Sequence, residues 1–232
     1  MLIISACTLK GDLSMPTEKI REVTFVTEDK VAIAATYYEA VSEKGVILIH
    51  MLGNNRQSWK EVAEILQKNE YQVLTIDLRG HGQSLQKNNQ RISYVNFHEQ
   101  DFLDMVKDIQ AAKNFLEKQG ISEITIIGAS IGANLALITA AHDPDITRIV
   151  ALSPGLNYKG IKPQEDSKKI SVPVMLVAAE DDAYSAMSVR TLDMVIRAQK
   201  EVKIFPKADH GTRMIQQQPS LKGDILKFLQ NY

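Results

Sequence analysis

A serine between two glycines, at a predicted turn, is the side chain in this sequence best placed to act as a nucleophile. Residues 128–132 read Gly-Ala-Ser-Ile-Gly and fit the pattern G-x-S-x-G. The apolar run before them predicts a strand, and the run after them predicts a helix. Glycines on both sides let a strand and a helix approach closely, and the turn holds the hydroxyl above the helix N-terminus, where partial positive charge favours a developing anion. We therefore predict that Ser130 is a nucleophile.

Strands and helices alternate along most of the chain and must position this serine. Continuous apolar runs predict strands buried on both faces at 45–50, 72–77, 123–128, 147–152, 172–179 and 201–205. Helical spacing predicts helices at 56–68, 98–119, 131–142, 185–199 and 221–232. Residues 23–26 and 31–38 predict an opening antiparallel hairpin. The alternation predicts an α/β fold with a mostly parallel sheet of about eight strands and helices on both faces, with chemistry beyond the carboxyl ends of the strands.

Composition narrows the class of protein. The chain has 232 residues, 44% hydrophobic and 24% charged, with a net charge of −1. This fits one α/β domain, which we expect to cover residues 20–232 without a large cap. A nearly neutral chain is not typical of a nucleic-acid-binding protein, and no apolar run is long enough for a transmembrane helix. Oligomeric state stays open.

The single cysteine, Cys7, excludes an internal disulfide and lies in an unusual context. Residues 4–7 read Ile-Ser-Ala-Cys and resemble a bacterial lipobox, but only six residues precede the cysteine and none is basic. Two interpretations of residues 1–19 stay open. In the first, these residues are the remainder of a lipoprotein signal. The precursor then carries a lipid anchor at Cys7, and the protein lies in the bacterial cell envelope. Otherwise they are a polar tether, with translation starting at Met15 and a cytoplasmic location.

Two further stretches, together with the turn at Ser130, make the chain similar to the α/β-hydrolase superfamily from about Val23 to its end. Residues 50–54 read His-Met-Leu-Gly-Asn, similar to the His-Gly-x-Gly type turn after the family's third strand. Residues 77–84 read Asp-Leu-Arg-Gly-His-Gly-Gln-Ser, similar to the family's D-x-R-G-H-G-x-S loop. The resemblance implies an α/β-hydrolase fold and a serine esterase or lipase-like member with a minimal lid. Dehalogenases and epoxide hydrolases of this fold have aspartate in place of Ser130, so the serine excludes these two classes of enzyme.

The family's chain order of serine, acid and histidine implies the base. A serine hydroxyl is a weak nucleophile until a base accepts its proton. Only His142 and His210 follow Ser130 along the chain. His142 lies at the predicted C-terminus of a helix, where a cation suits the helix dipole. His210 follows the last predicted strand in the run Ala-Asp-His-Gly, which resembles the family's histidine loop, and is therefore the predicted base.

The resemblance also implies an acid after the strand at 172–179. Three carboxylates stand there in a row, Glu180, Asp181 and Asp182. In related sequences this strand often ends in Gly-x-x-Asp, and that pattern falls on Asp182, with Asp181 as the alternative. Asp209 is interpreted as structural, because adjacent loop residues rarely face each other.

The oxyanion of a tetrahedral intermediate needs backbone donors. The resemblance implies the N–H groups of Ile131 and Leu52, with Met51, which replaces the family's usual glycine, or the side-chain amides of Asn54 and Asn55 as alternatives to the second. His50 and residues 79–84 are expected to brace the site. Substrate contacts are predicted at Met51, Tyr184, Met187 and Met214. Further candidates for the pocket wall are Tyr94, Phe97, Leu156 and Tyr158.

The predicted reaction is hydrolysis of small soluble carboxylic esters through a Ser-His-Asp triad and an acyl-enzyme. Residues 153–169 are too short and polar for a multi-helix lid, so a lipase for long-chain triglycerides is disfavoured. No metal or organic cofactor is expected, because no Cys/His cluster has ligand spacing. A thioesterase, a feruloyl-type esterase or a peptidase on the same triad stays open, as does a non-catalytic ligand-binding member of the fold.

Overall fold

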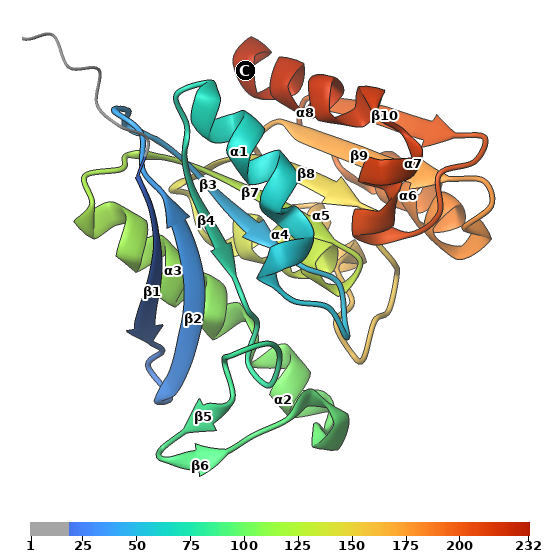
Figure 1. Cartoon of the computed structure of the whole chain (residues 1–232). Coiled ribbons are helices and arrows are strands. Elements are labelled where there is room, and N and C mark those ends of the chain that lie inside the picture. The colour runs from blue at the N-terminus through green and yellow to red at the C-terminus, as the bar shows by residue number, and fades with distance from the viewer. Residues whose placement is uncertain (1–18) are drawn as a thin grey trace, which may run out of the picture.

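The chain begins, in the part that its computed structural model describes, with an antiparallel hairpin (Figure 1). The structure describes residues 19–232, so the predictions for Cys7 and for the leading segment through residue 18 lie outside the described residues. Strand β1 (Ile20–Val26) pairs with β2 (Val31–Tyr38), as predicted. Strand β2 then pairs antiparallel with a strand of the central sheet and so joins the hairpin to it.

Six parallel strands form the centre of the sheet. They are β3 (Lys44–Ile49), β4 (Gln72–Ile76), β7 (Glu123–Ala129), β8 (Ile146–Leu152), β9 (Val174–Ala179) and β10 (Lys200–Phe205). Their order across the sheet is β10-β9-β8-β7-β3-β4, followed by the antiparallel β2. The carboxyl ends of all six therefore lie at one edge. The predicted mostly parallel sheet is confirmed, with ten strands instead of about eight.

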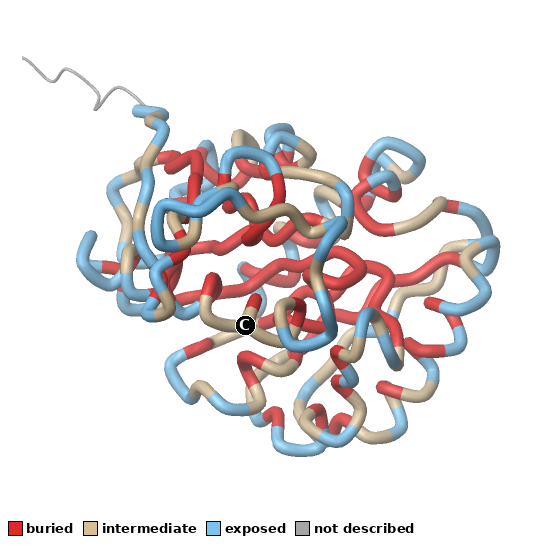
Figure 2. The backbone as a smooth tube through the Cα atoms, turned by 90° about the horizontal axis from the view of Figure 1, so that it is seen from below, coloured by how far each residue is buried: buried red, intermediate tan, exposed pale blue. Residues whose placement is uncertain are grey.

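Helices cover both faces of this sheet and bury two cores. Helices α1 (Lys60–Lys68), α7 (Met214–Gln217) and α8 (Ser220–Asn231) lie on one face. Helices α3 (Val106–Lys118), α4 (Ile131–His142) and α6 (Ala183–Val195) lie on the other. Alternate side chains of β3 enter opposite cores. Ile47 and Ile49 lie in the core under α3, α4 and α6, and Val46 and Leu48 lie in the core under α1, α7 and α8. Figure 2 shows this buried centre and its exposed rim.

Three segments differ from the sequence-based expectation. The helix predicted at 98–119 is interrupted, giving α2 (Glu99–Leu103) and α3, because backbone bonds around Met105 span three residues instead of four. The helix predicted at 185–199 is α6, which ends at Val195. The polar loop after β4 contains a small hairpin of β5 (Gln86–Lys87) and β6 (Gln90–Arg91).

Only a short segment connects β8 to β9 across the top of the sheet. Its one α-helix is the four-residue α5 (Gln164–Ser167), which packs near α4. No helix within residues 19–232 has the length and apolarity that crossing a bilayer requires.

Buried ion pairs hold the loop that follows β4. The Asp77 carboxylate accepts hydrogen bonds from the backbone N–H groups of Arg56, at 2.7 Å, and Gln83, at 2.8 Å. A side chain at Gly82 would collide with this carboxylate, because its Cβ would lie 2.1 Å from Asp77 Oδ2. The guanidinium of Arg79 binds Asp108 at 2.8 Å, and both side chains are buried. Residues 77–84 thus form a rigid loop beneath the sheet edge where the candidate site lies.

Candidate active site

Ser130 lies on a strained turn between β7 and α4. Its backbone is in a positive-φ conformation, with φ 55° and ψ −117°, and it is the N-cap residue of α4. The glycines on either side are required by space. A Cβ on Gly128 would lie 2.1 Å from the carbonyl oxygen of Gly132, and a Cβ on Gly132 would lie 2.6 Å from the carbonyl oxygen of Ile49 on β3. The spacing read from the sequence is therefore the spacing that this close approach needs.

The predicted base and acid contact one another. His210 follows β10 and Asp182 follows β9, and their side chains meet with His210 Nδ1 2.6 Å from Asp182 Oδ2. The alternative acid, Asp181, is engaged elsewhere, since its carboxylate accepts a hydrogen bond from the N–H of Ala208 at 3.1 Å. Asp209 accepts from the backbone N–H of His210 at 2.6 Å and pairs with Arg213.

A buried serine that the sequence analysis missed holds the histidine loop. Ser153 is fully buried at the end of β8, and its hydroxyl accepts a hydrogen bond from the N–H of Gly211 at 2.9 Å. Because Gly211 is next to His210, this bond fixes the backbone that carries the imidazole. The only signal in the sequence is a polar residue directly after an apolar strand.

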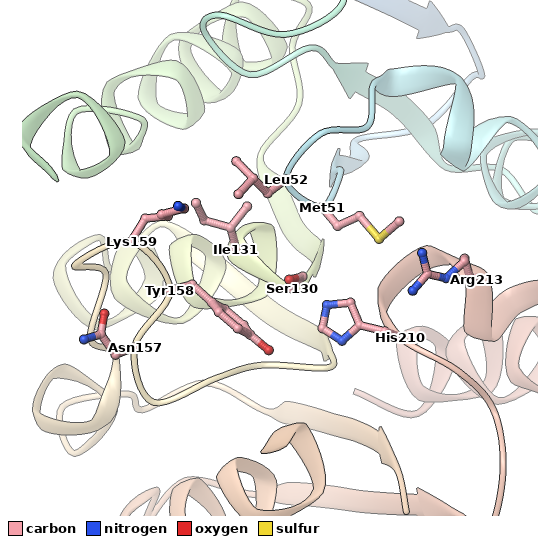
Figure 3. A pocket seen from close by; sticks show the side chains of 9 residues that line it. All are labelled: Met51, Leu52, Ser130, Ile131, Asn157, Tyr158, Lys159, His210 and Arg213. Atoms are coloured by element: carbon pink, nitrogen blue, oxygen red, sulfur yellow. The ribbon is translucent and has the colours of Figure 1, made fainter. Parts of the chain in front are cut away.

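Ser130 and His210 line one cavity of about 340 Å³ (Figure 3). In Figure 3 the imidazole of His210 lies beside the Ser130 side chain, between it and Arg213. The remaining lining residues come from the loop after β3, from the start of α4, from the segment after β8 and from the histidine loop. They are Met51, Leu52, Ile131, Asn157, Tyr158, Lys159 and Arg213.

The loop after β3 is oriented by a buried histidine. His50 Nε2 accepts a hydrogen bond from the N–H of Leu78 at 3.0 Å, so Nδ1 holds the proton and donates it to the carbonyl of Met51 at 2.8 Å. Complete burial, helped by the neighbouring His81, lowers the pKa of His50 to about 3, so the ring is neutral. Because a trans peptide unit is planar, the N–H of Leu52 points opposite to the held Met51 carbonyl.

The N–H of Ile131 is the first of helix α4, so it has no partner within the helix. Leu52 and Ile131 both line the cavity. The two predicted oxyanion donors therefore belong to residues on the same side of Ser130 (Figure 3).

An asparagine on α4 fastens the segment that covers part of the cavity. Asn134 is fully buried; its Nδ2 donates to the carbonyl of Ile161 at 3.0 Å, and its Oδ1 accepts from the N–H of Gly155 at 2.9 Å. On the opposite side, the hydroxyl of Tyr184 accepts from the N–H of Asn157 at 2.9 Å. A polar residue within the apolar run of helix α4 was the available signal for Asn134.

Tyr158 is held by this segment against the three central side chains. Its ring meets the ring of His210 edge-on, with centroids 6.2 Å apart. Its hydroxyl lies 3.2 Å from Ser185 Oγ and donates to the carbonyl of Ser153 at 3.4 Å. Burial raises the pKa of Tyr158 to about 12, so the phenol stays neutral beside Asp182.

The other side chains expected at the pocket wall lie elsewhere. Of the four predicted substrate contacts, only Met51 lines this cavity. Met214, the first residue of α7, is fully buried in the core that α7 and α8 cover. Met187 is exposed on α6. Tyr184 anchors Asn157 instead of facing the cavity. The looser candidates Tyr94, Phe97 and Leu156 do not line it either, and Tyr94 stacks on His81.

Metal-ligating side chains are not gathered at this site. Across residues 19–232, no group of three or more His, Cys, Asp or Glu side chains is arranged to hold a metal ion.

Comparison with known sequences identifies a family and two curated relatives. Residues 45–169, more than half of the chain, match the sequence profile of the alpha/beta hydrolase fold family. A thermostable monoacylglycerol lipase of a Bacillus species is 29% identical over 128 residues, which are 55% of this chain and 47% of the lipase. Ethanol acetyltransferase 1 of Wickerhamomyces anomalus is 26% identical over 108 residues, which are 46% of this chain and 24% of that protein. The chain thus matches about half the length, or less, of these relatives.

A solved structure covers nearly the whole chain. An esterase of Pyrococcus furiosus superposes with a TM-score of 0.75 and 22% identity, over 99% of this chain and 95% of the esterase. At this identity the likeness concerns the fold alone.

Acidification is expected to destabilise the protein through His50. The pKa of His50 is about 3 in the folded chain against a normal value of 6.5, so between these values the unfolded chain holds a proton that the folded chain lacks. The free energy of unfolding should fall as the pH drops below about 6.5, by up to about 1.4 kcal/mol per pH unit for this one proton. Burial also lowers the pKa of His81, which acts in the same direction. Urea unfolding at several pH values measures the slope.

His50→Gln is expected to make this slope shallower. Gln57→Ala, which removes an exposed neutral side chain near the same loop, is the control and should keep the wild-type slope. An unchanged slope in His50→Gln would contradict the assignment.

Replacing Asn134 is expected to release the segment 155–161. In Asn134→Ala the buried N–H of Gly155 loses its partner, and the carbonyl of Ile161 keeps only its bond from the N–H of Tyr158, at a cost of about 2 kcal/mol in unfolding free energy. Hydrogen exchange of the amides in 155–161 should speed up. Asn114→Ala, on the exposed face of α3, serves as the control. Protection of 155–161 equal to that of the wild type would show that Asn134 does not hold the segment.

Proposed function

The chain belongs to the α/β-hydrolase fold family, and we propose that it is a serine hydrolase that cleaves small carboxylic esters through an acyl-enzyme on Ser130. The observation that carries the proposal is the geometry around one cavity. A serine in a strained turn shares this cavity with a histidine whose far nitrogen lies 2.6 Å from a carboxylate. Acyl transfer to water by a Ser-His-Asp triad needs this combination of groups.

In the proposed first step, the Ser130 hydroxyl attacks the ester carbonyl carbon while His210 Nε2 accepts its proton. Asp182 stabilises the imidazolium through the bond to Nδ1, which also sets the tautomer that leaves Nε2 free as a base. The tetrahedral intermediate collapses when His210 gives the proton to the departing alkoxide, which leaves as an alcohol. Water then attacks the acyl-enzyme by the same route and regenerates Ser130.

The oxyanion of each tetrahedral intermediate is assigned to the N–H groups of Ile131 and Leu52. The first lies at the N-terminus of α4, where the helix dipole adds to the hydrogen bond. The second belongs to the peptide unit that His50 orients through the Met51 carbonyl. Both donors are fixed before substrate binds, so little reorganisation accompanies the reaction.

The size of the substrate is proposed from the cavity and from the segment above it. A cavity of about 340 Å³, to which the segment after β8 contributes Asn157, Tyr158 and Lys159, fits a small ester without a moving lid. A relative is named a monoacylglycerol lipase, a name that denotes hydrolysis of an ester. Met51, Tyr158 and Ile131 supply the apolar walls.

Loss of the nucleophile is the first test. Ser130→Ala should lower kcat for p-nitrophenyl acetate or butyrate by about 10⁴-fold or more, because no side chain then forms the acyl-enzyme. A fluorophosphonate probe should label the wild type at Ser130 and leave the variant unlabelled. Ser122→Ala, an exposed serine at the start of β7, is the control. Wild-type protein that neither reacts with the probe nor hydrolyses any member of a panel of p-nitrophenyl esters, an acyl-CoA and an aminoacyl amide would refute the proposal.

The choice between the two aspartates gives a second test. Asp182→Asn should lower kcat by about 10³–10⁴-fold, since an amide no longer stabilises the imidazolium or selects its tautomer. Asp181→Asn keeps an oxygen for the N–H of Ala208 and should change kcat by only a few fold. If Asp181→Asn had the larger effect, the acid would be misassigned.

A further inference from the structure

We propose that Lys159 forms a subsite for a carboxylate at the far end of the acyl group, so that half-esters of dicarboxylic acids are the preferred substrate class. This inference rests on the proposed esterase function and goes beyond it. It is carried by the charges around the cavity, by the turn that presents the lysine, and by the side of Ser130 on which the lysine lies.

The cavity has one positive charge that no neighbouring carboxylate balances. Its two permanently charged lining residues are Lys159 and Arg213. Arg213 is paired with Asp209, with Nη2 2.9 Å from Oδ1. Among residues 19–232, Lys159 has no carboxylate within 4.0 Å of its ammonium, and Glu99, which packs against Gly160, forms no ion pair with it. The negative charge of Asp182 is directed at His210.

The turn that carries Lys159 is rigid, and it holds the lysine in a backbone conformation that lysines disfavour. Tyr158 and Ile161 exchange two backbone hydrogen bonds, at 3.1 and 3.0 Å, around a two-residue loop of Lys159 and Gly160. Both loop residues have positive φ, 55° and 88°. Glycine, asparagine and aspartate are preferred in such turns, whereas a lysine is disfavoured at positive φ. Turn formation therefore does not explain the lysine, and backbone strain of this kind is often found at functional positions.

The same turn is fastened on three sides, which fixes where the lysine begins. Asn157 Oδ1 accepts from the N–H of Gly160 at 2.9 Å. Asn134 holds Ile161, and Tyr184 holds Asn157. An ammonium on a rigid support loses less conformational freedom on binding than one on a mobile loop.

The position of Lys159 relative to His210 assigns it to the acyl group. His210 must protonate the leaving oxygen, so the alcohol part of the substrate lies on the His210 side of Ser130. Figure 3 shows Lys159 on the opposite side, beyond Ile131, and its ammonium lies over the ring of Phe102, 5.8 Å from the ring centroid. The wall between Ser130 and Lys159 is formed by Ile131, Leu52 and Tyr158, which suits a short methylene chain. An acyl chain that begins at Ser130 and ends in a carboxylate would match these features in order.

Matched esters that differ only in charge test the inference. Methyl hydrogen adipate carries a carboxylate, and methyl adipamate has a neutral amide of the same shape. The wild type should show a kcat/KM ratio of about five in favour of the carboxylate, the size expected for one partly exposed ion pair. Methanol release measures both substrates, and glutarate and suberate half-esters locate the best chain length. In Lys159→Met the ratio should fall to about one or below, whereas Lys159→Arg should retain it.

Lys162→Met is the matched control, because it removes a lysine from the same segment outside the cavity lining. Its ratio should equal that of the wild type. Three outcomes would overturn the inference: no preference in the wild type, an unchanged ratio in Lys159→Met, or loss of the ratio only in Arg213→Met. If neutral esters are cleaved with dependence on Ser130 in these cases, the proposed function stands and only the carboxylate subsite fails. If no ester is cleaved, both fail.

Discussion

The close approach of helix α4 to strands β7 and β3 is the constraint on which the site depends. Gly128 and Gly132 have no room for a Cβ, and the contacts that forbid one are backbone atoms that cannot move aside. This crowding forces Ser130 to a positive φ and lifts its hydroxyl to the sheet edge. The same approach brings the first N–H of α4 next to the loop after β3. One packing requirement thus sets the position of the proposed nucleophile and of both proposed oxyanion donors.

The remaining parts of the site are fixed by polar side chains that bind backbone, mostly out of contact with the cavity. Ser153 holds Gly211, Asp181 holds Ala208, and His50 holds Met51. The bonds of Ser153 and Asp181 join the histidine loop to the ends of β8 and β9, and the bond from the N–H of Leu78 to His50 joins the loop after β3 to the end of β4. Loops that are far apart in sequence are therefore positioned by the sheet. A site built in this way is ready before substrate arrives, which is what electrostatic stabilisation of a transition state requires.

The fold predicted from the sequence is confirmed, and the structure brings the predicted Ser130, Asp182 and His210 together, whereas only Met51 of the four predicted substrate contacts lines the cavity. The G-x-S-x-G turn, the alternating elements and the order of Ser130, Asp182 and His210 are visible because each follows a strand. The break in 98–119 was missed, since the apolar periodicity continues through Met105. Met187 and Met214 were also expected at the wall. Whether such a residue faces the cavity depends on helix rotation, which places one in solvent and the other in the core.

We propose that the short segment between β8 and β9 lets the site discriminate among substrates without a mobile lid. A mobile lid selects substrates by closing, but residues 155–161 are tied to α4 through Asn134 and to α6 through Tyr184. Tyr158 and Lys159 therefore meet every substrate in the same place. Because burial keeps the Tyr158 phenol neutral, the phenol can pack beside Asp182 while the negative charge of Asp182 still acts on His210. The neutral ring of Tyr158 gives the acyl side of the cavity an apolar zone near the proposed nucleophile, and the charge of Lys159 gives it an ionic zone farther away. We therefore expect the site to discriminate by the length and the end group of the acyl chain.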